Sequence, residues 1–245
     1  MAKQKGNLKL VGTIGDLTFY QDENGEFIVK KKRKKTGKRN KSKSGVKAQR
    51  TQFGTAAQYS SLLYQSIARF RRNSCDRNMI SRINLLFFQL LNLDEDHQKG
   101  KRRIASALKH PESVELIRRF KFRKNYSFNS ILQTNYELNE SSEQILLTNV
   151  VPNIHFKSPK YATHVGLKCA TLWIDFEKPN FEIKESDEVN LLLDETVQDI
   201  TFPINSTEKK TGHVFHLLKV NYFKEINGVQ ETLLNESFNC MGFVV

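Results

Sequence analysis

The densest group of ligand-binding side chains is a lysine- and arginine-rich stretch from Lys30 to Lys43. Ten of its 14 residues are Lys or Arg, and none is apolar. Each cation that neutralises a phosphate releases condensed counterions, so this stretch favours a polyanion without reading base sequence. A solubilising linker and a nuclear localisation signal fit the same composition. The candidate nucleic-acid-binding residues in this basic arm are Lys30, Lys31, Lys32, Arg33, Lys34, Lys35, Lys38, Arg39, Lys41 and Lys43.

Three further basic groups lie at residues 69–82, 99–103 and 118–124. The outer face of a helical bundle is normally charged, but it usually mixes acids and bases, whereas these groups are mostly cationic. If the helices that carry them fold back on each other, the groups could share one surface and extend the footprint of the basic arm. From these groups we add to the candidate binding residues Arg69, Arg71, Arg72, Arg102 and Arg103.

The charge of the whole chain is divided unevenly. Residues 1–125 hold 30 Lys and Arg against 10 Asp and Glu, a net charge of +20. Residues 126–245 hold 9 against 16, a net charge of −7. A basic front and an acidic rear indicate either a polyanionic partner or head-to-tail contact between copies of the chain.

Residues with catalytic or metal-binding chemistry are present but poorly arranged. Cys75 lies between Arg72 and Arg77, which favours a lowered thiol pKa, but no base accompanies it. His213 and His216 are three residues apart, which in a strand sends their rings to opposite faces. Residues 94–96 are all acidic but lack the spacing of a calcium loop, so we interpret them as a solvated helix end.

No phosphate-binding glycine loop, nucleophile elbow, RNP motif, KH loop or zinc finger is recognisable in the sequence. We therefore expect no catalytic residue, no metal, no cofactor and no small-molecule substrate, and we do not expect an enzyme. An enzyme with an unrecognised site is the third-ranked alternative.

The three cysteines, Cys75, Cys169 and Cys240, cannot all pair, which indicates reduced thiols and a cytoplasmic protein. Apolar runs are far shorter than the roughly 20 residues that span a bilayer, so we expect no contact with a membrane. No secretion signal is recognisable.

The elements that position these residues begin with strand-like runs at residues 8–11, 17–20 and 26–29. Residues 22–25 (Asp-Glu-Asn-Gly) form a turn signal between the last two runs. Together they predict an N-terminal β-hairpin over residues 1–29. A sheet this small has only marginal stability alone, so we expect it to pack against the rest of the protein or against another molecule.

Helical spacing follows the basic arm. Apolar and small residues 3 and 4 apart predict a helix over residues 46–72, with Ser74 as the cap of the next helix, over residues 79–93. The wide apolar stripe of the second helix predicts an antiparallel pair. Short helices are expected over residues 102–109 and, opened by Pro111, over residues 112–120. The face of the first helix is expected to consist of Phe53, Ala56, Ser60, Leu63, Ile67 and Phe70.

From residue 126 onward, short apolar runs alternate with turn residues at intervals of about ten, as in an all-β sandwich. Trp173 is the expected core anchor, and Asn227-Gly228 is the clearest hairpin turn. We predict seven to nine strands, with an immunoglobulin-like arrangement as a first guess. The expected strands are 130–138, 144–151, 163–176, 181–184, 188–193, 200–204, 213–224, 230–234 and 238–245.

The predicted fold class is α+β, and its four parts follow the chain in order. They are a β-hairpin (1–29), a basic flexible arm (30–45), a short helical bundle (46–125) and an antiparallel β-sandwich (126–245). The helical and sandwich parts could form two domains, with a boundary near residues 123–127.

The opening KGNLKLVGTIGDLTFY (residues 5–20) resembles the start of a family of bacterial proteins of similar length with no known activity. Residues 49–54 and 81–83 are similar to later segments of that family. Where the family continues into a segment of mixed charge, this chain carries its basic arm instead. The resemblance implies a bacterial origin and no mechanism.

The pattern as a whole favours a non-enzymatic nucleic-acid-binding protein. Its basic arm and arginine groups would contact DNA or RNA phosphates, and its β-sandwich would contact a protein. The alternative is a self-assembling structural subunit, part of a phage-like particle or filament, whose copies meet head to tail.

Overall fold

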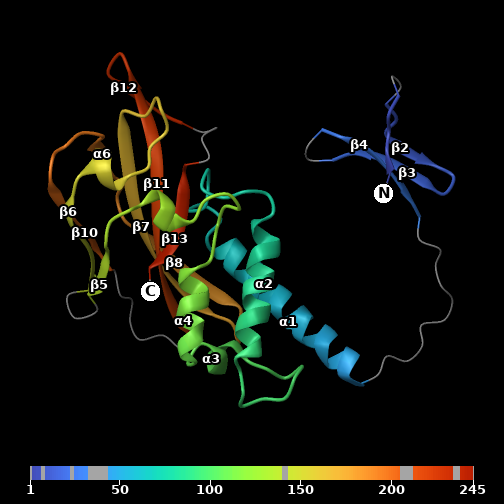
Figure 1. Ribbon diagram of the computed structural model, residues 1–245. Coiled ribbons are helices and arrows are strands. Elements are labelled where there is room, and N and C mark those ends of the chain that lie inside the picture. The colour runs from blue at the N-terminus through green and yellow to red at the C-terminus, as the bar shows by residue number, and fades with distance from the viewer. Residues whose placement is uncertain are drawn as a thin grey trace. The chain divides into compact units, whose positions relative to one another are not determined.

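The structure, a computed structural model, divides the chain into two compact units, residues 1–43 and residues 44–245 (Figure 1). The residues that it describes are 2–6, 9–22, 25–32, 44–139, 143–204, 212–233 and 238–244.

The N-terminal unit is a four-stranded antiparallel sheet in the order β1-β4-β3-β2. The strands expected at residues 17–20 and 26–29 are confirmed. The strand expected at residues 8–11 is wrong for residues 9–11, which lie before β2, and Leu8 lies outside the described residues. Strand β2 begins at Gly12, and Gly15, with a φ of 56°, turns the chain directly into β3. The strand bounds are β1 Ala2–Lys3, β2 Gly12–Ile14, β3 Leu17–Gln21 and β4 Phe27–Lys31.

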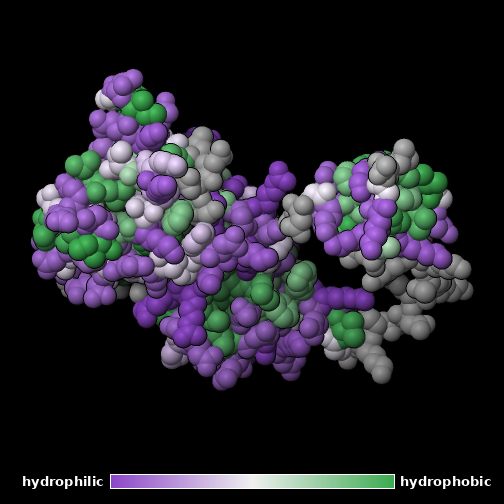
Figure 2. Space-filling view, turned by 45° about the horizontal axis from the view of Figure 1, so that its top comes forward, coloured by the Kyte–Doolittle hydropathy of each residue, from purple (hydrophilic) through white to green (hydrophobic). Residues whose placement is uncertain are grey.

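This small sheet has no core of its own in its described residues, none of which is buried. Register places Ile14, Leu17, Phe19 and Val29 on one face, since Ile14 pairs with Leu17 and Phe19 pairs with Val29. Ile14 remains 62% exposed. Hydrophobic side chains are accordingly visible on the surface of this unit in Figure 2. That this sheet needs a further surface for burial stays a prediction, in keeping with its small size.

The second unit opens with two long antiparallel helices. The Gln52 side chain near the start of α1 bonds Asn92 at the end of α2, while Tyr59, further along α1, packs on Phe87. The apolar stripe of α2 is buried as predicted. Pro111 opens α4 as expected, with the His110 side chain accepting a hydrogen bond from the second helical residue. The helices are α1 Ser44–Ser66, α2 Met79–Asn92, α3 Ile104–Ala107 and α4 Pro111–Arg118.

Three details of the helical prediction are wrong. Helix α1 ends at Ser66, and residues 67–73 continue as turns. Ser74 does not cap α2, which begins at Met79, because its buried hydroxyl donates back to the Arg72 carbonyl instead. Phe53 is 54% exposed, since it lies beside Phe88 but no further helix or strand of the described residues covers it.

The acidic triplet 94–96 is also different from the solvated helix end that was expected. The Asp94 side chain is fully buried and accepts hydrogen bonds from the backbone N–H groups of Asp96 and Arg103 and from His97 Nδ1. Burial raises the pKa of this carboxyl, but the bonds from Arg103 and His97 outweigh it and lower the pKa overall. Asp94 thereby fixes the loop between α2 and α3.

The centre of the second unit is a six-stranded antiparallel sheet. Its two central strands are β7 and β11, which pair along most of their length. Strands β8 and β9 pair with β7 on one side, and β12 and β13 pair with β11 on the other. A second antiparallel sheet has the order β10-β6-β5. The strands are β5 Glu137–Asn139, β6 Gln144–Val150, β7 His164–Asp175, β8 Asn180–Glu185, β9 Val189–Leu192, β10 Gln198–Pro203, β11 His213–Ile226, β12 Val229–Thr232 and β13 Cys240–Val244.

Both faces of the six-stranded sheet are covered. Alternate residues such as Leu172, Leu217 and Phe243 pack with the helices in one hydrophobic cluster. Their neighbours, such as Leu167 and Val220, pack with the three-stranded sheet in another. The order of layers is therefore helices, large sheet, small sheet (Figure 1). Helices and sheet share a core across residues 123–127, and the division between units lies at residues 43 and 44 instead.

The α+β class and its nine C-terminal strands in the described residues are confirmed, whereas the immunoglobulin-like arrangement stays a prediction. The Asn227-Gly228 hairpin is confirmed, with both residues at positive φ between Ile226 and Val229. The strand expected over residues 130–138 is wrong at its start. Phe128 and Ile131, three residues apart, are buried together on a one-turn helix, α5 Phe128–Ile131. A second one-turn helix that the sequence missed is α6 Pro152–His155.

A glycine in β13 tests this packing. A Cβ built on Gly242 would lie 2.5 Å from the Phe128 ring. We expect Gly242→Ala to lower the free energy of unfolding by about 1–3 kcal/mol, because the core cannot take the extra carbon without shifting. The measurement is urea denaturation. The matched control is Gly54→Ala in α1, where nothing lies within 4 Å and where we expect a gain of about 0.5–1 kcal/mol. Equal stability of Gly242→Ala and the parent would contradict the packing.

Candidate nucleic-acid interface

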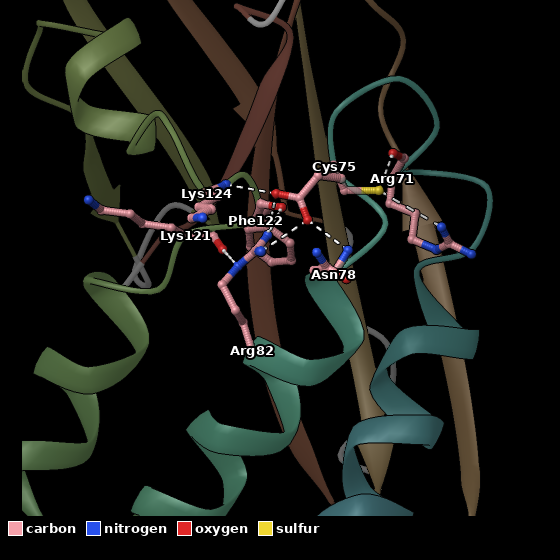
Figure 3. A network of polar contacts seen from close by, with 8 residues as sticks. Arg71, Cys75, Asn78, Arg82, Lys121, Phe122 and Lys124 are labelled. Carbon is pink, nitrogen blue, oxygen red and sulfur yellow. Dashed lines mark hydrogen bonds and ion pairs between the residues drawn. The ribbon is translucent and has the colours of Figure 1, made fainter. Parts of the chain in front are cut away.

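The connection between α1 and α2 is organised around the carboxylate of Asp76. Arg82, in the first turn of α2, binds it with both terminal nitrogens, at 3.0 Å to Oδ1 and 2.8 Å to Oδ2. The backbone N–H of Asn78 donates to Oδ1 at 2.9 Å, and that of Lys124 donates to Oδ2 at 2.8 Å. Figure 3 shows these contacts converging above the start of α2. One carboxylate therefore joins its own loop to a segment 48 residues further along.

The same segment is tied down by two arginines. Arg82 also donates to the carbonyl oxygens of Lys121, at 3.0 Å, and Phe122, at 2.7 Å. Arg123 Nη2 donates to the Asn73 carbonyl at 2.6 Å. Charge-assisted bonds of this kind are stronger than neutral ones. Residues 121–124 are therefore held against the α1–α2 connection.

Burial raises the pKa of the Asp76 carboxyl, but the hydrogen bonds from Arg82 and Lys124 and the charge of Arg82 outweigh it and lower the pKa overall. Asp76 is thus ionised at neutral pH. Its charge is used within this network and does not neutralise the remaining cations around it.

The network holds the α1–α2 connection and residues 121–124 side by side. Five exposed cations of these two segments make neither an ion pair nor a side-chain hydrogen bond among the residues that the structure describes. We call them the basic surface: Arg69, Arg72, Arg77, Lys121 and Lys124. Arg71 lies among them but stacks on the Tyr64 ring, 3.9 Å from its centre, with Nη1 3.8 Å from Cys75 Sγ.

The basic surface continues into a hollow of about 360 Å³ at the end of α4. Arg118, Arg119 and Lys121 line it, together with one carboxylate, Glu115. Glu115 makes a close ion pair with Arg119 and a looser one, at 3.9 Å, with Arg118. The hollow is therefore net cationic but partly neutralised from within. We call it the cationic hollow.

The described candidate residues from the sequence lie in three places: the end of β4, the α1–α2 connection, and the start of α3. Lys30, Lys31 and Lys32 are exposed at the end of β4. Within the described ranges none of the three contacts a carboxylate, and Lys32 Nζ lies 3.3 Å from the Gly15 carbonyl. Arg69, Arg71 and Arg72 lie in the α1–α2 connection. The candidates that fall outside the described residues are Arg33, Lys34, Lys35, Lys38, Arg39, Lys41 and Lys43.

Arg102 and Arg103 do not join the basic surface. Arg102 bonds Asn92, at the far end of α2 from Arg82, and Arg103 lies 3.6 Å from Glu177. A helix of the length of α2 spans about 20 Å, which separates these two arginines from the surface. The structure therefore brings the α1–α2 connection and residues 121–124 together and leaves Arg102 and Arg103 apart from them.

Groups with nucleophilic or metal-binding chemistry are dispersed. Burial raises the pKa of the Cys169 thiol to about 12 and raises that of Cys240 as well, so both are poor nucleophiles. His213 packs beside Phe176 and His216 bonds Thr171, on opposite faces as the spacing predicts. In the ranges that the structure covers, no three His, Cys, Asp or Glu side chains gather as metal ligands.

The residue that the sequence did not single out is Asp76. A single acid among arginines carries no spacing signal, and its partners at residues 121–124 are fixed only by the fold. Among the described helices, none has the length and apolarity that crossing a bilayer requires. Comparison with family models, curated proteins and solved structures found no match to the chain.

Replacing Asp76 tests the network. We expect Asp76→Asn to lower the free energy of unfolding at pH 7 by about 1–3 kcal/mol, because charged hydrogen bonds are lost. Hydrogen exchange at the Lys124 amide should quicken. Because the folded-state pKa of Asp76 is lowered, its contribution is complete above the unfolded pKa and disappears as pH falls through the folded value. The difference between parent and variant should thus shrink below about pH 4.

The control for this experiment is Asp96→Asn, an exposed acid whose backbone, not its carboxylate, makes the hydrogen bond observed there. It should leave both stability and the Lys124 amide unchanged. An Asp76→Asn protein with unaltered exchange at Lys124 would refute the role of Asp76 in holding residues 121–124.

Proposed function

We propose that the protein is a non-enzymatic nucleic-acid-binding protein that contacts phosphates without reading base sequence. The observation that supports this most is the basic surface, whose five cations lack a carboxylate partner among the described residues while the nearest acid, Asp76, is committed to Arg82. Because no neighbouring acid neutralises these cations, their positive potential attracts a polyanion. Lys30, Lys31 and Lys32 add a second exposed cationic site.

The sequence context supports the same proposal. Ten cations within 14 residues of the basic arm and a net charge of +20 in residues 1–125 provide far more positive charge than solubility requires. Binding through phosphates should show a steep dependence on salt and little preference between sequences. A cytoplasmic location, suggested by the three thiols, is consistent with either DNA or RNA as the ligand.

The test is fluorescence anisotropy of labelled DNA and RNA at 50 and 200 mM salt. The parent should lose about 10³-fold or more in affinity over this range if six or more phosphates are neutralised. Arg72→Gln/Arg77→Gln/Lys124→Gln should weaken binding to all sequences alike and reduce the salt slope by about 3. These side chains are exposed, so stability should change little.

The matched control neutralises three exposed lysines away from the basic surface, Lys109→Gln/Lys160→Gln/Lys178→Gln. It removes the same charge and should weaken binding much less. Affinity that is indifferent to salt, or an equal loss in both triple variants, would count against a localised phosphate-binding surface.

A second candidate function, head-to-tail self-assembly, is favoured by where the acidic charge lies. Residues 175–200 hold nine acids and two lysines, the full −7 of residues 126–245. They include β8 and β9, which form one edge of the six-stranded sheet. Residues 1–43 hold 13 basic and 4 acidic residues. An acidic sheet edge on one copy and a basic, coreless unit on another are complementary.

Sedimentation of the full chain without nucleic acid tests this second function. We expect association that grows with protein concentration and weakens with salt, since it depends on opposite charges. Asp187→Lys/Glu195→Lys, at two exposed acids of this stretch, should abolish it. Glu137→Lys/Glu231→Lys, at exposed acids elsewhere, changes the net charge equally and should not. A monomer at every concentration would eliminate head-to-tail assembly.

A further inference from the structure

A second hollow adjoins the cationic hollow and has different chemistry. Its volume is about 380 Å³, and it shares the lining residues Arg118 and Asn129 with its neighbour, so the two lie next to each other. Its other polar lining residues, Gln133, Thr134 and Asn135, follow the one-turn helix α5. We call it the amide hollow.

The lining of the amide hollow suits a neutral, flat, polar ligand. Three carboxamides and a hydroxyl offer both donors and acceptors, as the edge of a nucleobase requires. Arg118 brings the only charge to this lining. The volume is at the low end of the roughly 300–1,000 Å³ of small-molecule sites, which is enough for one base.

Tyr136 supplies an aromatic surface in the same hollow. It is half-buried and packs edge-on against Phe128, with ring centres 6.1 Å apart, which restrains its orientation. Burial raises the pKa of its hydroxyl, and the charge of Arg118 opposes this only in part, so the hydroxyl stays a proton donor at neutral pH. A base can stack on such a ring regardless of its identity.

We infer that the amide hollow holds one unpaired base of a single-stranded nucleic acid whose phosphates lie along Arg118, Arg119 and Lys121. The inference rests on the proposed function and narrows its substrate to single strands. In a duplex the bases are stacked and paired, and extruding one costs free energy. Phosphate contacts alone would favour the duplex, which has the higher charge density, so a preference for single strands would come from this hollow.

The carboxylate of Glu115 has a definite part in this arrangement. It occupies Arg119 and lies near Arg118 when no ligand is bound. A phosphate must share these two guanidinium groups with the Glu115 carboxylate, whose negative charge repels it. Removing its charge should therefore strengthen binding, by about two- to fivefold for an exposed ion pair.

The test compares a labelled 12-nucleotide single strand, as DNA and as RNA, with the duplex of the same sequence, using the full chain. Tyr136→Ala should weaken binding of the single strand by about 5- to 50-fold, since stacking is lost, and leave duplex binding unchanged. Tyr136→Phe keeps the ring and should retain most of the affinity. Glu115→Gln should bind both ligands more tightly.

Tyr136 packs against the core, so a second variant keeps the test decisive if Tyr136→Ala folds poorly. Asn135 is exposed and lines the hollow. Asn135→Ala should leave stability unchanged and reduce binding of the single strand selectively. Tyr161→Ala, at a 62% exposed tyrosine that lines neither hollow, is the matched control.

The outcomes separate this inference from the proposed function. Equal binding of single strand and duplex, with no selective effect of Tyr136→Ala or Asn135→Ala, overturns the base site and leaves the phosphate-binding surface intact. Failure of every nucleic acid to bind overturns both.

Discussion

The arrangement of charge in this protein depends on one carboxylate in the connection between two helices. Asp76 accepts four hydrogen bonds, two from Arg82 and two from backbone N–H groups, one of which belongs to Lys124. With a neutral residue there, Arg82 would lose its anchor, and residues 121–124 would lose their hold on the connection. Asp76 thus holds together segments whose cations would otherwise repel one another, while its own negative charge pairs with Arg82.

The layers behind this surface explain why it stays in place. The helices that carry the basic segments share a hydrophobic cluster with Leu172, Leu217 and Phe243 of the large sheet, whose opposite face is covered by the small sheet. Helix α4 and the segment after it lie against β13 through Phe120, Phe122 and Phe243. The backbone that carries these cations is therefore ordered before binding, which limits the entropy lost when a ligand binds.

The sequence predicted most of the elements, because their signals are local. The stripe of α2, the long apolar runs of β7 and β11 and the Asn227-Gly228 turn each follow from a few neighbouring residues. The predictions that failed concern residues whose burial or hydrogen bonds depend on segments far away in the sequence. Phe53 fits a helical face, but it remains 54% exposed in the part of the chain that the structure describes. Asp94 and Asp76 look like surface acids until the fold brings backbone N–H groups to them. The hollows behind α4 form from segments whose meeting no spacing rule indicates.

Charge and shape have separate roles in the site that results. A cationic surface attracts any nucleic acid, and its contribution falls steeply with salt because counterions return. The amide hollow contributes hydrogen bonds and stacking, which salt screens far less. If both act on one strand, the factor by which the hollow raises the affinity for unpaired bases persists as salt rises, although total affinity falls. Charge alone supplies no such salt-independent factor, because its whole contribution falls with salt.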